Sequence, residues 1–95
     1  MEQAATSTSA SLRPINAEAI SIIRQSYDEQ EARTASTLGR DVKHAERVNM
    51  AISGLLKFCQ GEPIAAVESA RIEMERHLIA GETVGTALSF ALGGE

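Results

Sequence analysis

The chain lacks a second cysteine and a long apolar run, the features on which an internal disulfide and membrane insertion depend. It holds a single cysteine, so it cannot form an internal disulfide. No apolar run approaches the roughly 18 residues that a membrane-spanning helix needs. Met1 is followed by a polar stretch rather than by a basic and apolar leader. We therefore expect a cytoplasmic location and no contact with a membrane.

Motifs of the common enzyme and cofactor-binding families are also missing. The sequence has no G-x-S-x-G, no G-x-x-x-x-G-K-[ST] and no G-x-G-x-x-G. Glu73 and His77 have helical spacing, but two side chains are too few for a metal site, and His44 lies far from them in the sequence. We therefore expect neither an enzyme nor a bound cofactor or metal.

The core must be built from small and aliphatic side chains. The chain has no tryptophan, and its aromatic residues are Tyr27, Phe58 and Phe90. A chain of 95 residues forms one domain at most and buries a smaller share of its surface than a large one. Because oligomerisation stabilises small chains with surplus apolar surface, we expect a homodimer.

Helical periodicity predicts an all-α fold, with three to four helices forming a small bundle that is completed as a homodimer. Residues 1–13 are rich in Ser, Thr and Ala and lack periodicity, which predicts a flexible N-terminal arm before a single helical domain, 14–95. Asn16 is suited to the N-cap of the first helix. The polar stretch 28–37 is either a helical extension or a loop, and its good helix formers favour a helix.

Glycine and proline predict the ends of the other helices. Gly39 either breaks the chain before a second helix over residues 41–60 or lies inside one long helix, and we expect the break. A third helix should run from Pro63 to Gly81, and a last short helix over 83–92. The third helix should bury one stripe and direct Ile72 and Ile79 elsewhere. Its expected core residues are Ile64, Val67, Ala70, Met74 and Leu78, and those of the last helix are Val84, Leu88, Ala91 and Leu92.

The strongest pattern is a mostly apolar series whose gaps alternate between four and three residues, from Leu38 to Cys59. This 3.5-residue spacing places side chains along one seam of a helix. A buried Asn in such a series, here Asn49, fixes register and partner number. The series is either a dimer seam or a core stripe with Asn49 at its solvent edge. The predicted dimer-seam residues are Val42, Ala45, Asn49, Ile52, Leu56 and Cys59.

A second apolar set lies off this seam. Together with the seam, it makes the second helix apolar over more than the roughly 100° that a surface helix needs. Two apolar faces suggest one partner within the fold or dimer and another outside it, whereas the alternative is full burial at the centre of a bundle. The predicted partner-binding residues are Leu55, Phe58, Phe90 and Leu92.

The charge of the chain argues for protein partners rather than nucleic acid. The formal net charge is −4, and the acidic excess lies in residues 62–95. An acidic chain is a poor binder of phosphates. One basic stripe opposes this trend, and it is either a surface for an acidic partner or a solvated helix face. It consists of Arg40, Lys43, His44 and Arg47.

The sequence shows two resemblances to known proteins. Residues 59–78 resemble a Gly-x-Pro-x-x-x-Ala/Val-x-x-x-Ala pattern of small bacterial helical proteins of unknown function. The whole layout resembles QslA-type antiactivators of LuxR-family quorum-sensing regulators, in its polar N-terminal arm, the helix ending LLKFCQG at 55–61, and the acidic third helix. The resemblance implies a cytoplasmic homodimer that binds the ligand-binding domain of a LasR-like transcription factor, occupies its dimerisation surface and prevents DNA binding.

Two other classes of function stay open. A small DNA-binding regulator would use the basic stripe as a recognition helix, and its affinity for DNA would fall steeply with salt. A secretion chaperone or an antitoxin would also be a small acidic helical dimer, with an effector or toxin as its partner.

Overall fold

The computed structural model describes residues 12–93, and four helices with no strand make up that part of the chain. They are α2 (Ala17–Leu38), α3 (His44–Phe58), α4 (Ile64–Ile79) and α5 (Val84–Ala91). The all-α prediction is confirmed. The predicted arm lies outside the described residues except for Leu12 and Arg13.

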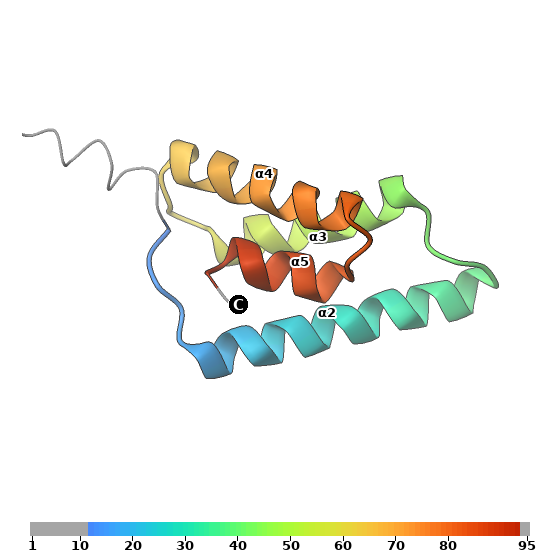
Figure 1. Ribbon diagram of the computed structural model, residues 1–95. Coiled ribbons are helices and arrows are strands. Elements are labelled where there is room, and N and C mark those ends of the chain that lie inside the picture. The colour runs from blue at the N-terminus through green and yellow to red at the C-terminus, as the bar shows by residue number, and fades with distance from the viewer. Residues whose placement is uncertain (1–11, 94–95) are drawn as a thin grey trace, which may run out of the picture.

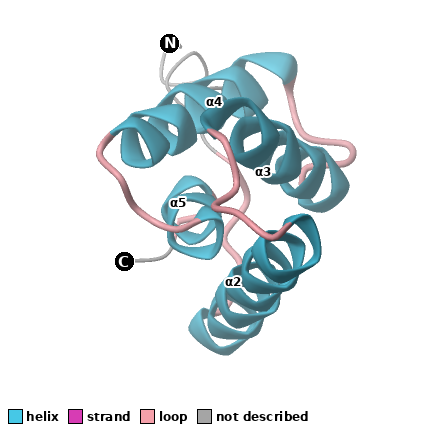
Figure 2. Ribbon diagram, turned by 90° about the vertical axis from the view of Figure 1, so that its right-hand side faces the viewer, coloured by secondary structure: helices cyan, strands magenta, loops and turns pink. Residues whose placement is uncertain are grey.

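The short last helix, α5, occupies the centre of the fold. It packs against α2, α3 and α4, and α3 also packs against α4. Figure 1 shows α2 along one side of α5 and α4 along the other, and Figure 2 shows α5 beside α2, with α3 and α4 above it. The predicted core residues of α5 are buried as expected, Val84, Leu88, Ala91 and Leu92.

Two glycines allow the helices to approach α5 closely. A side-chain carbon added at Gly85 would collide with the backbone carbonyl oxygen of Arg24 and the carboxylate of Asp28 in α2. A carbon added at Gly54 would lie 2.8 Å from Leu88 Cδ2 and 3.0 Å from the Tyr27 ring. Neither helix can therefore carry a larger residue at these positions without moving apart from its neighbour.

The ends of α2 follow the local signals in the sequence. The Asn16 side chain accepts a hydrogen bond from the Ala19 N–H at 2.8 Å and so caps the first turn. Gly39 has a left-handed conformation with φ of 69°, which ends the helix. The polar stretch 28–37 is helical, and the predicted break at Gly39 is confirmed.

The second predicted helix starts later than expected. α3 begins at His44 because Lys43 is extended, with ψ of 156°, and its N–H donates to Glu46 Oε1 at 2.9 Å. Val42 consequently lies in the loop before α3, and Leu38 is the last residue of α2. The prediction that the series from Leu38 to Cys59 shares one helix is therefore wrong.

α4 buries most of its predicted stripe but not its first residue. Ala70, Met74 and Leu78 are in the core, whereas Ile64 is 88% exposed. Pro63 is the N-cap rather than part of the first turn, so Ile64 is the first helical residue, and Ala66 occupies the inward position instead. At α5, the hydroxyl of Thr83 accepts from the Thr86 N–H and caps the helix.

Over residues 12–93, no helix combines the length and the apolar character that crossing a membrane requires.

Candidate interaction surface

Four predicted seam residues form one stripe on the outside of α3. Ala45, Asn49 and Leu56 are exposed and Ile52 is half-buried. They follow one another at gaps of four, three and four residues, so they share a helix face. Leu56 is 57% exposed, whereas Ile52 on the same face packs partly against the core. We call these four residues the α3 flank.

The other two predicted seam residues do not belong to this flank. Val42 precedes the helix, and Cys59 is 5% exposed in the core. Burial, followed by the charge of Glu62, raises the pKa of the Cys59 thiol. A neutral, buried thiol is a poor nucleophile, so Cys59 acts as a small apolar residue of the chain's own core and not as a dimer-seam residue.

Two of the predicted partner-binding residues are in the protein's own core. Leu55 is 1% exposed and Leu92 is 2% exposed, so the expectation that they contact an external partner is wrong. The reason is the central position of α5. Leu55 lies on the face of α3 that packs toward this helix, and Leu92 directly follows it.

The two phenylalanines of that set are half-buried and engaged with other rings. The Phe58 ring meets the edge of Tyr27 with centroids 6.2 Å apart, and Lys57 Nζ lies 5.6 Å from its centroid. Phe90 is stacked on His77 with centroids 4.2 Å apart and planes at 3°. Their exposed parts are therefore small, and their first role is to join neighbouring helices.

An ion-pair network holds α3 against α2 and α5. Arg47 Nε lies 2.6 Å from Glu31 Oε2, and the Arg47 guanidinium also donates to the Glu82 carbonyl. The other oxygen of Glu31 accepts from the Val84 N–H at 2.9 Å, and Asp28 accepts from the Gly85 N–H at 3.0 Å. Carboxylates of α2 thus cap the positive end of α5.

The predicted basic stripe is largely neutralised within the molecule. Arg40 binds both carboxylate oxygens of Glu46, at 3.0 and 2.9 Å, and Arg47 is paired with Glu31. Arg40 and Lys43 also precede α3, so the four basic residues do not share one helix. The solvated-face interpretation fits Arg40, whereas Arg47 is a structural residue.

His77 is held between two carboxylates at the junction of α4 and α5. Its Nδ1 lies 3.1 Å from Glu82 Oε2, and its Nε2 lies 3.2 Å from Glu73 Oε2. Only the doubly protonated ring can donate to both. Accordingly, hydrogen bonding to Glu82 and then to Glu73 raises the His77 pKa against the opposing effect of burial.

The carboxylates of Glu73 and Glu82 approach opposite edges of the His77 ring, so the three groups do not converge on one point. No cluster of three or more potential metal ligands occurs within the described range 12–93.

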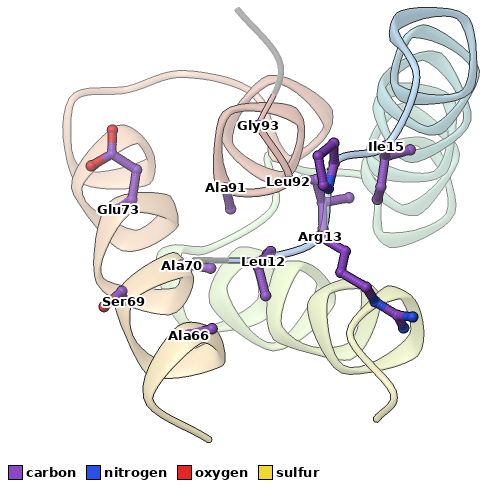
Figure 3. Close-up of a pocket in the computed structure, with 11 residues that line it drawn as sticks. Leu12, Arg13, Ile15, Ala66, Ser69, Ala70, Glu73, Ala91, Leu92 and Gly93 are labelled. Carbon is purple, nitrogen blue, oxygen red and sulfur yellow. The ribbon is translucent and has the colours of Figure 1, made fainter. Parts of the chain in front are cut away.

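A cavity lies between α4, the end of α5 and residues 12–15 (Figure 3). Its volume is about 440 Å³, and the α4 and α5 side chains at its floor are small, Ala66, Ala70 and Ala91. Glu73 at its edge is already bound by Arg76 at 3.0 Å and by His77. Arg13 points away from the cavity to Glu62, with Nε 2.7 Å from Oε2. The cavity therefore lacks convergent free polar groups that would orient a substrate.

α4 carries a second exposed apolar surface, which the predicted core stripe of this helix does not include. Ile64, Ile72 and Ile79 are 88%, 49% and 75% exposed. The placement of Ile72 and Ile79 away from the core is confirmed. The sequence signal for this surface was Ile72 and Ile79, which are seven residues apart and lie off the buried stripe.

No protein-family model matches this sequence, and neither a curated protein nor a solved structure matches it in the comparisons with known proteins. The resemblance to QslA-type antiactivators stays a prediction that rests on the residues quoted for it.

Proposed function

We propose that the protein is a protein-binding regulator. It pairs as a homodimer through the α3 flank and inhibits a LuxR-type transcription regulator by occupying that regulator's dimerisation surface. The observation that carries the proposal is Leu56, which is 57% exposed on a face that it shares with Ile52 and Asn49.

The composition of the α3 flank suits association with another helix. Burying a leucine and a half-buried isoleucine in a partner removes apolar area from water, at roughly 25 cal/mol per Å². Asn49 lies between them on the same face, where its amide would pair across a seam in only one register. The flank therefore supplies both an attractive contact and a device for specificity.

The opposite side of α3 is fixed, which favours binding through the flank. Gly54 packs against Tyr27 and Leu88, and Arg47 is tied to α2 and to the Glu82 carbonyl. A helix that is already ordered loses little conformational freedom when it meets a partner. The α3 flank is thus a preorganised surface.

The DNA-binding alternative has less support than the protein-binding one. Its two arginines are both engaged by carboxylates of this chain, at distances of 2.6 to 3.0 Å. Each would have to exchange an internal partner for a phosphate, and the chain carries a net charge of −4.

The regulatory proposal is tested by mixing the protein with the ligand-binding domain of a LasR-like regulator and analysing the mixture by gel filtration. A gel-shift assay with full-length regulator and its operator measures the consequence. We expect a complex and a loss of the regulator–DNA band, with an unrelated small helical protein as the control. Separate elution together with an unchanged DNA band would refute the proposal.

A further inference from the structure

The outer face of α4 carries a row of large apolar side chains that nothing in the described chain covers. Ile64, Ile72 and Ile79 account for three of the six large hydrophobic residues that are exposed in the described structure. They are separated by eight and seven residues, which at 3.6 residues per turn places all three within an arc of about 80° on one side of the helix. We call these three residues the α4 stripe.

The position of α4 in the bundle leaves this stripe accessible. Figure 1 shows α4 at the edge of the fold, on the side of α5 away from α2. Its inward positions are Ala66, Ala70, Met74 and Leu78, which are buried. A rise of about 1.5 Å per residue makes the stripe about 22 Å long, which matches four turns of a partner helix.

Charged side chains on the same face define what the stripe can bind. Arg71 lies between two carboxylates, with Nη1 2.6 Å from Glu75 Oε2 and Nε 3.2 Å from Glu68 Oε1. Arg71 balances one of these two glutamates. Arg76, which lies beside Ile72 and Ile79, is paired with Glu73 on the same helix, with Nη1 3.0 Å from Oε1, so the two groups together keep an excess of negative charge. A second copy of the stripe would double this excess, which disfavours self-pairing.

We propose that the α4 stripe is the docking site for an amphipathic partner helix that carries aliphatic side chains at matching spacing and lysine or arginine opposite Glu68 and Glu75. The proposal rests on the proposed function, because it identifies the surface through which the regulator would be bound. It also replaces Leu55 and Leu92, which are buried and cannot serve that role.

The first experiment uses a fluorescein-labelled synthetic helical peptide. The peptide carries three leucines at the spacing of the α4 stripe and lysines placed to face Glu68 and Glu75. Fluorescence anisotropy should show saturable binding that weakens as salt is raised. A second peptide with glutamates in place of the lysines should bind at least about ten-fold more weakly, because like charges then oppose each other.

Variants of the protein locate the contact. Ile72→Asp and Ile79→Asp should each weaken binding of the lysine peptide about ten-fold or more, because each removes buried apolar area and introduces a carboxylate. The matched control is Ile22→Asp, which changes a 63% exposed isoleucine on α2 and should leave the affinity unchanged. All three sites are surface positions, and thermal melts should confirm that the variants fold.

Three results would overturn the docking site: no binding of the lysine peptide, equal binding by Ile72→Asp, or a wild-type dimer that Ile72→Asp converts to a monomer. The last result would assign the stripe to self-pairing.

The same variants separate this inference from the proposed function. If a LasR-like ligand-binding domain binds the wild type and binds Ile72→Asp and Ile79→Asp equally well, the α4 docking site is wrong and the regulatory function stands. If the domain does not bind but the lysine peptide binds through α4, the regulatory function is wrong and the docking site stands.

Discussion

α4 and α5 are both rich in aliphatic residues, yet α5 is mostly buried and α4 is mostly accessible to water. Six of the eight residues of α5 are buried, whereas four of the sixteen residues of α4 are. α5 is surrounded by three helices, while α4 packs with one side and exposes isoleucines on the other. The hydrophobicity of a helix therefore does not decide whether it is core; its place among the other helices does.

The largest expected effect comes from disturbing the close packing of the buried helix, α5. Gly85→Ala adds one methyl group to α5, where it would collide with the Arg24 carbonyl and the Asp28 carboxylate. We expect a loss of about 3 kcal/mol in the free energy of unfolding, as for other overpacked sites. Urea denaturation followed by circular dichroism measures it.

The sign of the change in unfolding free energy for Gly85→Ala distinguishes a close contact from an exposed helix position. In an exposed helix interior, replacing glycine by alanine is stabilising by about 1 kcal/mol. A neutral or stabilising Gly85→Ala would therefore contradict the close contact between α2 and α5. Ile79→Asp on the outer face of α4 should change the free energy of unfolding by no more than about 0.5 kcal/mol, although it alters a far larger group than the single methyl added by Gly85→Ala.

A smaller effect on stability is expected at His77, which lies at the junction of α4 and α5. The His77 pKa is raised in the folded protein, so the ring's contribution to stability is complete below its ordinary pKa of about 6.5. The contribution is lost as the pH rises through the raised value. His77→Gln should therefore destabilise the protein more at about pH 6 than at about pH 8.

Thermal melts of the wild type and His77→Gln at both pH values measure this difference. Glu82→Gln serves as a second variant, because it removes the partner with the largest effect on the His77 pKa. A destabilisation by His77→Gln that is equal at both pH values would show that stacking on Phe90, rather than charge, accounts for the role of the ring.

Most of the helix ends could be predicted because their causes are local. Asn16, Gly39 and Thr83 each act within one turn of the helix that they begin or end. The late start of α3 does not follow from the seam pattern, because that pattern continues through the loop before the helix. The Glu46 carboxylate accepts hydrogen bonds from the Lys43 N–H and the Arg40 guanidinium, and the helix therefore begins at His44.

The choice of the core face could not be predicted, because it depends on contacts between distant segments. Leu55 and Leu56 are adjacent and chemically identical, but one faces α5 and the other faces water. Likewise, Asp28 and Glu31 belong to a polar stretch without a pattern, and their partners at the start of α5 lie more than fifty residues away. Sequence spacing shows that a helix has two apolar faces but not which of them is occupied.

The central claim is that the α3 flank pairs with a second copy of the chain, and sedimentation equilibrium of the wild type and Leu56→Asp tests it most directly. Leu56 is a cleaner probe than Ile52, which also packs partly against the core. The wild type should sediment with about twice the 10.1 kDa mass of the chain, and Leu56→Asp with the monomer mass at an unchanged melting temperature. A monomeric wild type, or a Leu56→Asp variant that stays a dimer, would contradict the claim.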